Sequence, residues 1–290
     1  MSKRAIIFIL RAFASLPLSM LYMLSGGAYF IIYYLLGYRK KVVGKNLREA
    51  FPEKSEKELK KIEKQFYHFL CDLIVETLKL LAISDEEMRE RVKIEDYEQV
   101  NDSIEKGKTV VLLLGHYGNW EWVQEIRRCF TEGAKEFSIY HPLKSKLWDE
   151  IFKEIRGRWH VSLLPQFSSV RTLLAAENRP WICGFIADHR PRMIEDNAKT
   201  PFLNHNTSFI YGPEVIGKKV GADFYYLEME RPKRGKYNIR FIKLEPDKEE
   251  LPYPMTRSFW RYLEKSIRKN PAFWLWSHKR WKYDEVISQS

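Results

Sequence analysis

The order of apolar and polar positions divides the chain into an apolar amino-terminal segment and a longer alternating body. No charged residue occurs from position 12 to position 38, a stretch rich in Leu, Ile, Met, Tyr and Phe. Beyond it, four short apolar runs have the length and composition of buried strands: Thr109–Leu114, Phe137–Tyr140, Val161–Leu164 and Trp181–Ala187. Helical periodicity appears near residues 119–131, 145–157, 168–178 and 213–220, and again from about 255 to 268.

Two further strands, near residues 223–230 and 237–244, have the pattern of a hairpin that turns at Lys236. Alternation of strands and helices predicts an α/β fold with a single mixed, mostly parallel sheet that is covered by helices on both faces. Ser55 and Glu58 form a capping box, which predicts that a helix begins after Ser55. Because no repeat or linker divides residues 46–290, we expect one domain there, with ligands at the carboxyl ends of its strands.

The uncharged segment is long enough for one membrane-spanning helix. Arg11 and Pro17 interrupt its amino-terminal part and Gly26-Gly27 weaken its middle, so a kinked span and a segment lying in the membrane interface fit as well as a straight helix. Tyrosines that precede Arg39, Lys40 and Lys41 resemble a headgroup anchor. A cleaved signal peptide and a buried helical hairpin of a soluble protein are the competing interpretations. We favour a membrane anchor over residues 1–45, with the basic body in the cytoplasm.

Composition narrows the class of partner. The chain has 290 residues, 45% of them apolar and 30% charged, which excludes a disordered protein. A net charge of +11, with 17 Phe, 16 Tyr and 9 Trp, favours an anionic and partly apolar partner, such as a lipid headgroup or a nucleic acid. The three cysteines form no C-x-x-C pair, which argues against a disulfide scaffold or zinc knuckle and favours a reducing compartment.

The strongest candidate for chemistry directly follows the run 109–114, in the sequence GHYGNWE. A histidine on the turn after a buried strand lies where sheets present catalytic groups, and Asn119 is a candidate helix N-cap. With His116 on this turn, the Glu121 carboxylate can reach back to one imidazole nitrogen and leave the other free as a base. A structural histidine, with a glutamate favoured only by the helix dipole, explains the spacing equally well.

The segment VVLLLGHYGNWEW resembles the H-x4-(D/E) block of the lipid A biosynthesis acyltransferases, the lauroyl and myristoyl transferases of Gram-negative bacteria. Other blocks resemble that family in the same order, over nearly the whole chain: RKKVVGKNLREAFP from Arg39, YHPLK from Tyr140, IRG from Ile155, ADH from Ala187, TPFL from Thr200, YGP from Tyr211, and the ending NP followed by WLWSHKRWK. The sequence departs at His141, where many members have arginine, and a neutral imidazole is a poorer phosphate ligand.

The resemblance implies a glycerolipid-acyltransferase-like fold with an amino-terminal membrane helix, in the bacterial inner membrane with its catalytic domain facing the cytoplasm. It implies a general base at His116, oriented by Glu121, that deprotonates an acceptor hydroxyl for attack on an acyl carrier protein thioester. No acyl-enzyme, metal or other cofactor is implied. The remaining expected positions bind substrate or organise the pocket: Gly118, Asn119, Trp120, His141, Lys144, Arg156 and Asp188. Among them, His141, Lys144 and Arg156 are candidates to hold phosphate or the developing oxyanion.

Three alternatives stay open. The first is an acyltransferase for another acceptor, such as a glycerolipid, aminolipid or glycolipid. The second is a membrane-bound binding protein without catalysis, and the third is a metal-dependent lipid hydrolase. His116, His189 and His205 could be combined into a metal site, although no H-x-x-x-H or H-E-x-x-H spacing supports one. The Trp-rich carboxyl terminus could stack on single-stranded nucleic acid, but beside a membrane segment we expect anchoring or core packing, and no nucleic-acid partner.

Overall fold

The computed structural model describes residues 3–287 except 158–161, 176, 178 and 192–194. Seven strands form the main sheet in the order β1-β9-β8-β2-β5-β3-β4. All neighbours in it are parallel except the β8–β9 hairpin, so the predicted mixed, mostly parallel sheet is confirmed. A small antiparallel sheet has the order β10-β7-β6.

The strands have the following bounds: β1 Val92–Glu95, β2 Val110–Leu114, β3 Lys135–Tyr140, β4 Ser162–Pro165, β5 Trp181–Ile186, β6 Lys199–Phe202, β7 His205–Ser208, β8 Asp223–Lys233, β9 Lys236–Lys243 and β10 Glu285–Val286. The helices are α1 Lys3–Ala14, α2 Leu18–Phe30, the π-helix η1 Ile31–Leu35, α3 Lys40–Ala50, α4 Glu56–Lys79, α5 Asp85–Arg91, α6 Glu98–Glu105, the 3-10 helix η2 Trp122–Cys129, α7 Lys146–Gly157, α8 Gln166–Leu174, α9 Gly212–Lys219, α10 Pro254–Lys269 and the short 3-10 helix η4 Pro271–Phe273.

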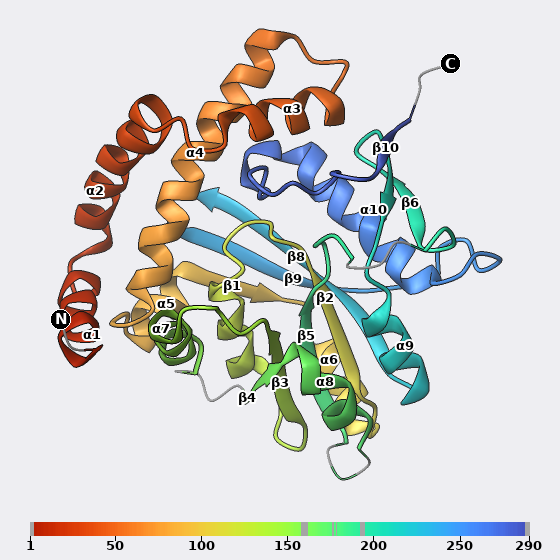
Figure 1. The fold of residues 1–290 in the computed structure, drawn as a ribbon. Helices are drawn as coiled ribbons and strands as arrows, with labels where there is room; N and C mark the ends of the chain where they lie inside the picture. Colours follow the sequence, from red (N-terminus) through yellow and green to blue (C-terminus); the bar gives the residue numbers. More distant parts are fainter. Residues whose placement is uncertain (1–2, 158–161, 176, 178, 192–194, 288–290) are drawn as a thin grey trace.

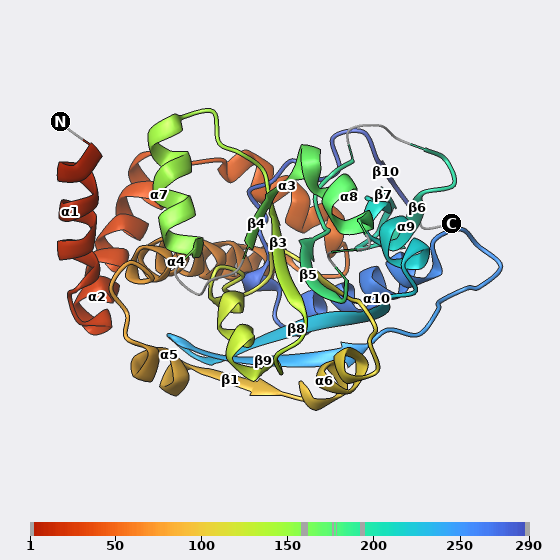
Figure 2. The same cartoon turned by 90° about the horizontal axis from the view of Figure 1, so that it is seen from below.

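Both faces of the sheet are buried, as expected for strands that are apolar throughout. In β2, Val111 and Leu113 pack on one side with residues of α8, α9 and α10, while Val110, Leu112 and Leu114 pack on the other with residues of α5, α6, α7 and η2. Figures 1 and 2 show α1, α2 and α7 at one end of the molecule and α9, α10 and the small sheet at the other.

The amino-terminal segment packs against the body of the protein. α2 runs beside α4, which begins at the predicted capping box of Ser55 and Glu58 (Figure 1). The chain breaks between α1 and α2 at Pro17, as its sequence predicts. Gly26-Gly27, which were expected to weaken the middle of the segment, lie inside α2, and the helix continues through both glycines to Phe30. Packing on α4 supplies the stability that two glycines remove from a helix.

Several boundaries differ from the sequence-based expectation. The β8–β9 hairpin turns at Arg234-Gly235 and not at Lys236, because Gly235 has a φ of +70°. A Cβ on Gly235 would lie 2.3 Å from the Tyr22 hydroxyl oxygen. The segment predicted as helix 119–131 is a 3-10 helix that starts at Trp122. Strand β1 and the small sheet were not expected, and the first residue of the predicted strand 161–164 lies outside the described part of the chain.

Candidate functional site

Three neighbouring strands end at the edge of the sheet where His116 lies. β5 lies between β2 and β3 and is parallel to both, so the three carboxyl ends share one edge. His116 follows β2, Asp188 follows β5, and His141 follows β3. The sheet therefore brings the residues after β2 and β5 side by side, although they are far apart in the sequence.

The turn that carries His116 needs both of its glycines. Gly118 has a φ of +66°, and a Cβ there would lie 2.5 Å from the Met229 sulfur. A Cβ on Gly115 would lie 2.7 Å from a methyl group of Leu263. The carboxyl-terminal segment holds the turn from outside, because the Gly118 N–H donates to the Phe273 carbonyl and the His116 carbonyl accepts from the Leu275 N–H. Gly118, which was expected to bind substrate, provides a backbone conformation here.

Asp188 fixes the imidazole of His116. Asp188 Oδ1 lies 2.6 Å from His116 Nδ1, and Oδ2 accepts the His116 backbone N–H at 2.9 Å and the Trp274 indole N–H at 2.8 Å. Burial acts to raise the pKa of Asp188, but the neighbouring imidazole and these hydrogen bonds outweigh it and hold the pKa well below its usual range. The ionised carboxylate therefore places the proton on Nδ1 and leaves Nε2 as an acceptor.

The structure does not form the expected contact between Glu121 and His116. Glu121 forms a two-bond ion pair with Arg156 at the end of α7, with Nε–Oε2 at 2.9 Å and Nη2–Oε1 at 2.6 Å. Both carboxylate oxygens are thus held by a guanidinium whose fork matches them, a stronger interaction than one bond to an imidazole. The adjacent strand end supplies Asp188 to His116 instead.

Asn119 and Trp120 separate in their roles. Asn119 is fully buried: its Oδ1 accepts the Trp122 N–H at 3.1 Å and its Nδ2 donates to Glu76 Oε2 at 2.8 Å. The N-cap of η2 is Glu121 and not the predicted Asn119, which instead supports the start of the helix through its bond to Trp122. The expectation that Asn119 binds substrate stays a prediction, and its side chain is fully buried here. Trp120 packs edge-on against His116, with ring centroids 5.0 Å apart.

An apolar pocket is lined in part by Trp120. It has a volume of about 100 Å³ and lies between the sheet and the helices η2 and α7. Trp120 is part of its wall and also packs on His116, and the Glu121–Arg156 ion pair forms a polar part of the lining. The apolar lining comes from strands β2, β3, β5 and β8 and from η2: Leu112, Leu114, Val123, Ile126, Phe130, Phe137, Ile139, Ile182, Ile186 and Leu227.

His141 and Lys144 lie on the loop from β3 to α7, and both side chains are exposed. They remain candidates for contact with a charged acceptor. Their position at the end of β3 puts them at the same edge of the sheet as His116.

The structure adds two residues that sequence analysis did not assign, His278 and Trp274. The imidazole of His189 stacks on His116 with centroids 4.1 Å apart, and that of His278 stacks on His189 at 4.7 Å. Burial lowers the pKa of His278 to about 4, so this ring is neutral near pH 7. Trp274 bonds directly to Asp188. Both come from the carboxyl-terminal WLWSHKRWK block, whose residues signalled a resemblance but not a place in the site.

A metal site does not form from the histidines considered above. His205 stacks on Trp281 in the small sheet, with its Nδ1 2.8 Å from the Leu203 carbonyl oxygen. Within the described ranges, no group of three or more His, Cys, Asp or Glu side chains is arranged to hold a metal ion.

Comparison with known proteins gives one result for the chain. The family model described as bacterial lipid A biosynthesis acyltransferase matches residues 3–283, nearly its full length. A search of curated proteins finds no match.

Proposed function

Because the chain belongs to the bacterial lipid A biosynthesis acyltransferase family, we propose that it moves a fatty acyl chain from an acyl carrier protein thioester to a hydroxyl of a lipid A precursor. The observation that carries the mechanism is the His116–Asp188 pair at the strand ends. The apolar pocket lined by Trp120, whose ring packs on His116, supports an acyl substrate. Acyl carrier protein as the donor, and this acceptor, rest on the resemblance.

In the proposed reaction, Nε2 of His116 accepts the proton of the acceptor hydroxyl as its oxygen attacks the thioester carbonyl carbon. The carbonyl electron pair moves to oxygen, and it re-forms the double bond as the carbon–sulfur bond breaks. The leaving thiolate takes the proton from the imidazolium, so the products are an ester and a free thiol. Asp188 stabilises the imidazolium because its negative charge lies against Nδ1. These reaction steps need no nucleophile on the enzyme that would carry the acyl group.

Arg156 has few nitrogen atoms left to bind substrate in this mechanism. Nε and Nη2 already bind Glu121, and the carboxylate balances the charge of the guanidinium. We propose that the pair acts as one unit that shapes the polar end of the pocket, with Nη1 directed to oxyanion or phosphate. The exposed Lys144 and His141 are then the side chains that meet acceptor phosphate at the entrance.

The acyl chain occupies the apolar pocket in this proposal. A chain entering beside Trp120 passes between the apolar residues of β2, β5 and η2, which removes its methylene groups from water. Each buried methylene contributes about 0.8 kcal/mol, so several of them suffice to hold the donor in place.

We further propose that the amino-terminal helices lie in the plane of the inner membrane on its cytoplasmic side. Residues 18–35 form a helix that is long and apolar enough to span, but one face of α2 packs on α4 with Leu18 and Leu21 buried. The other side of α1, α2, η1 and the following turn exposes large apolar residues: Phe8, Ile9, Met20, Met23, Leu24, Phe30, Ile31, Tyr34, Leu35, Leu36 and Tyr38. An apolar face on a helix packed against the protein is typical of interfacial binding.

The test is acyl transfer by the purified protein in detergent, with acyl carrier protein thioesters and a lipid A precursor, followed by mass spectrometry. We expect a gain of one acyl chain, and a loss of roughly 10²–10⁴-fold for His116→Ala in a folded variant. A glycerolipid, an aminolipid and a glycolipid offered in parallel test the other acceptors. Loss of activity with a chelator would indicate a metal-dependent hydrolase, whereas the proposed transfer is indifferent to metal removal. Near-normal turnover by folded His116→Ala would refute the mechanism.

A further inference from the structure

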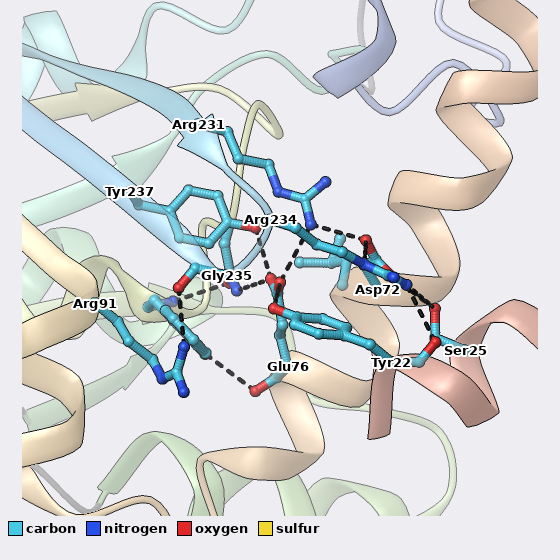
Figure 3. Close-up of polar contacts among 12 residues, drawn as sticks. Tyr22, Ser25, Asp72, Glu76, Arg91, Arg231, Arg234, Gly235 and Tyr237 are labelled. Atoms are coloured by element: carbon cyan, nitrogen blue, oxygen red, sulfur yellow. Dashed lines mark hydrogen bonds and ion pairs between the residues drawn. The ribbon is translucent and has the colours of Figure 1, made fainter. Parts of the chain in front are cut away.

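A fully buried carboxylate lies where the amino-terminal segment, α4 and the β8–β9 hairpin meet (Figure 3). Glu76 of α4 accepts from four side chains. Its Oε1 accepts from the Tyr22 hydroxyl at 2.6 Å and from Arg231 at 3.4 Å, and its Oε2 from the Tyr237 hydroxyl at 2.6 Å and from Asn119 Nδ2 at 2.8 Å. An ionised carboxylate only accepts, so it suits four converging donors.

Asp72 extends the cluster toward the amino terminus. It accepts the Ser25 hydroxyl at 2.6 Å, two bonds from Arg234 and one from Arg231. These contacts attach α2 to α4 and to the β8–β9 hairpin (Figure 3).

Glu76 contacts the segment 119–122 at two points. Asn119, which bonds to its carboxylate, also accepts the Trp122 N–H, and the Trp122 indole donates to the Glu76 backbone carbonyl at 3.0 Å. Residues 119–122 are therefore held at both ends by one residue of α4. His116 lies just before this segment and Glu121 lies inside it.

We propose that Glu76 is a positioning residue for acyl transfer, holding Asn119 and Trp122 so that His116 and Glu121 keep their places. The proposal rests on the proposed function. A buried charge contributes little or nothing to stability compared with a well-packed apolar residue, so stability alone does not account for Glu76. Placement does account for it, because a catalytic group displaced by about 1 Å costs on the order of 10²-fold in rate.

The same helix offers a matched control. Glu63 of α4 is also buried, and it accepts from the Tyr33 hydroxyl at 2.9 Å and from Lys60 at 2.7 Å. It thus ties the amino-terminal segment to α4 with the same chemistry as Glu76, but without a bond to residues 119–122. Glu63→Gln perturbs the docking of that segment and leaves the catalytic turn alone.

The test exchanges donor and acceptor across one contact. Asn119→Asp keeps the oxygen that accepts the Trp122 N–H but replaces the donating Nδ2 by an oxygen facing Glu76. Glu76→Gln in the same chain supplies a donor in return. We expect Asn119→Asp to lower kcat by about 10–100-fold with little change in KM, and the double variant to recover most of that loss. Glu76→Gln alone should cost a few-fold, and Glu63→Gln should leave kcat unchanged.

Hydrogen–deuterium exchange of residues 115–122 gives a second readout that needs no activity. Exchange should accelerate in Asn119→Asp, return toward the original rate in the double variant, and stay unchanged in Glu63→Gln. Absence of recovery in the double variant, or an equal kcat loss in Glu63→Gln, would overturn the proposal.

The same measurements separate this proposal from the proposed function. If the unaltered protein transfers no acyl group, the proposed function fails and exchange alone decides the positioning, with unchanged exchange in Asn119→Asp overturning it. If Asn119→Asp does not fold, Glu76→Gln decides, and normal kcat with normal exchange refutes the role.

Discussion

Replacing Asp188 by asparagine tests the central contact of the site. Two of the three bonds to Asp188 end on Oδ2 and one on Oδ1. If the amide oxygen of the asparagine takes the place of Oδ2, it still accepts from the His116 N–H and from Trp274. Its NH2 group then faces His116 Nδ1, which must become an acceptor. The imidazole proton moves to Nε2, and the base required by the mechanism is lost.

The magnitude follows from the alternatives open to this amide. If the side-chain amide of Asp188→Asn rotated by 180°, its oxygen would accept the Nδ1 proton of His116. Its NH2 group would then face the His116 backbone N–H and the Trp274 indole N–H, and these buried donors would stay unsatisfied at a cost of about 1–3 kcal/mol each. The wrong tautomer is therefore preferred. In a serine protease triad, the same carboxylate-to-amide change lowers kcat by about 10⁴-fold, which corresponds to about 5 kcal/mol of activation free energy. We expect a loss of about 10³–10⁴-fold here.

The assay is steady-state acyl transfer at saturating donor and acceptor, with thermal unfolding as a check on the fold. The melting temperature of Asp188→Asn should stay close to that of the unaltered protein, because two of the three hydrogen bonds survive. Its kcat should fall by the expected factor, with little change in KM. Glu121→Gln serves as the comparison, since Glu121 contacts Arg156 and not the imidazole. If Asp188→Asn stays within tenfold of normal while Glu121→Gln loses 10³-fold, the tautomer is set by Glu121 and the assignment fails.

Three more outcomes are expected. Arg156→Ala leaves a buried Glu121 carboxylate without its partner, so the melting temperature should fall by an amount equivalent to about 3–5 kcal/mol, and unchanged melting would show that the pair is exposed in solution. Burial lowers the pKa of His278 to about 4 in the folded protein, whereas the pKa of an unfolded histidine is about 6.5. The unfolded chain therefore binds a proton first as pH drops from about 6.5 to 4, and the free energy of unfolding should fall over that range. In denaturant titrations, a His278→Gln variant should show a flatter dependence of this free energy on pH. Met23→Gln combined with Leu35→Gln alters two side chains that are 78% and 67% exposed, so vesicle flotation should weaken without a change in melting; equal flotation would exclude this face as the membrane contact.

The sequence by itself determined much of the framework, because the signals involved are local. Uniformly apolar runs predicted the central strands, and the Ser55–Glu58 capping box predicted the start of α4. The residues around His116 predicted a turn after a buried strand. These features depend on side chains within a few positions of one another, so spacing is enough to find them.

Only the tertiary structure decided which groups work together. Asp188 meets His116 because β5 pairs with β2, and strand order cannot be read from the spacing of residues along the chain. Glu121 turns to Arg156 because α7 brings a guanidinium that satisfies both carboxylate oxygens. Likewise, α2 keeps its two central glycines in a helix because α4 lies alongside it, so contacts between distant segments outweigh local preference where the two conflict.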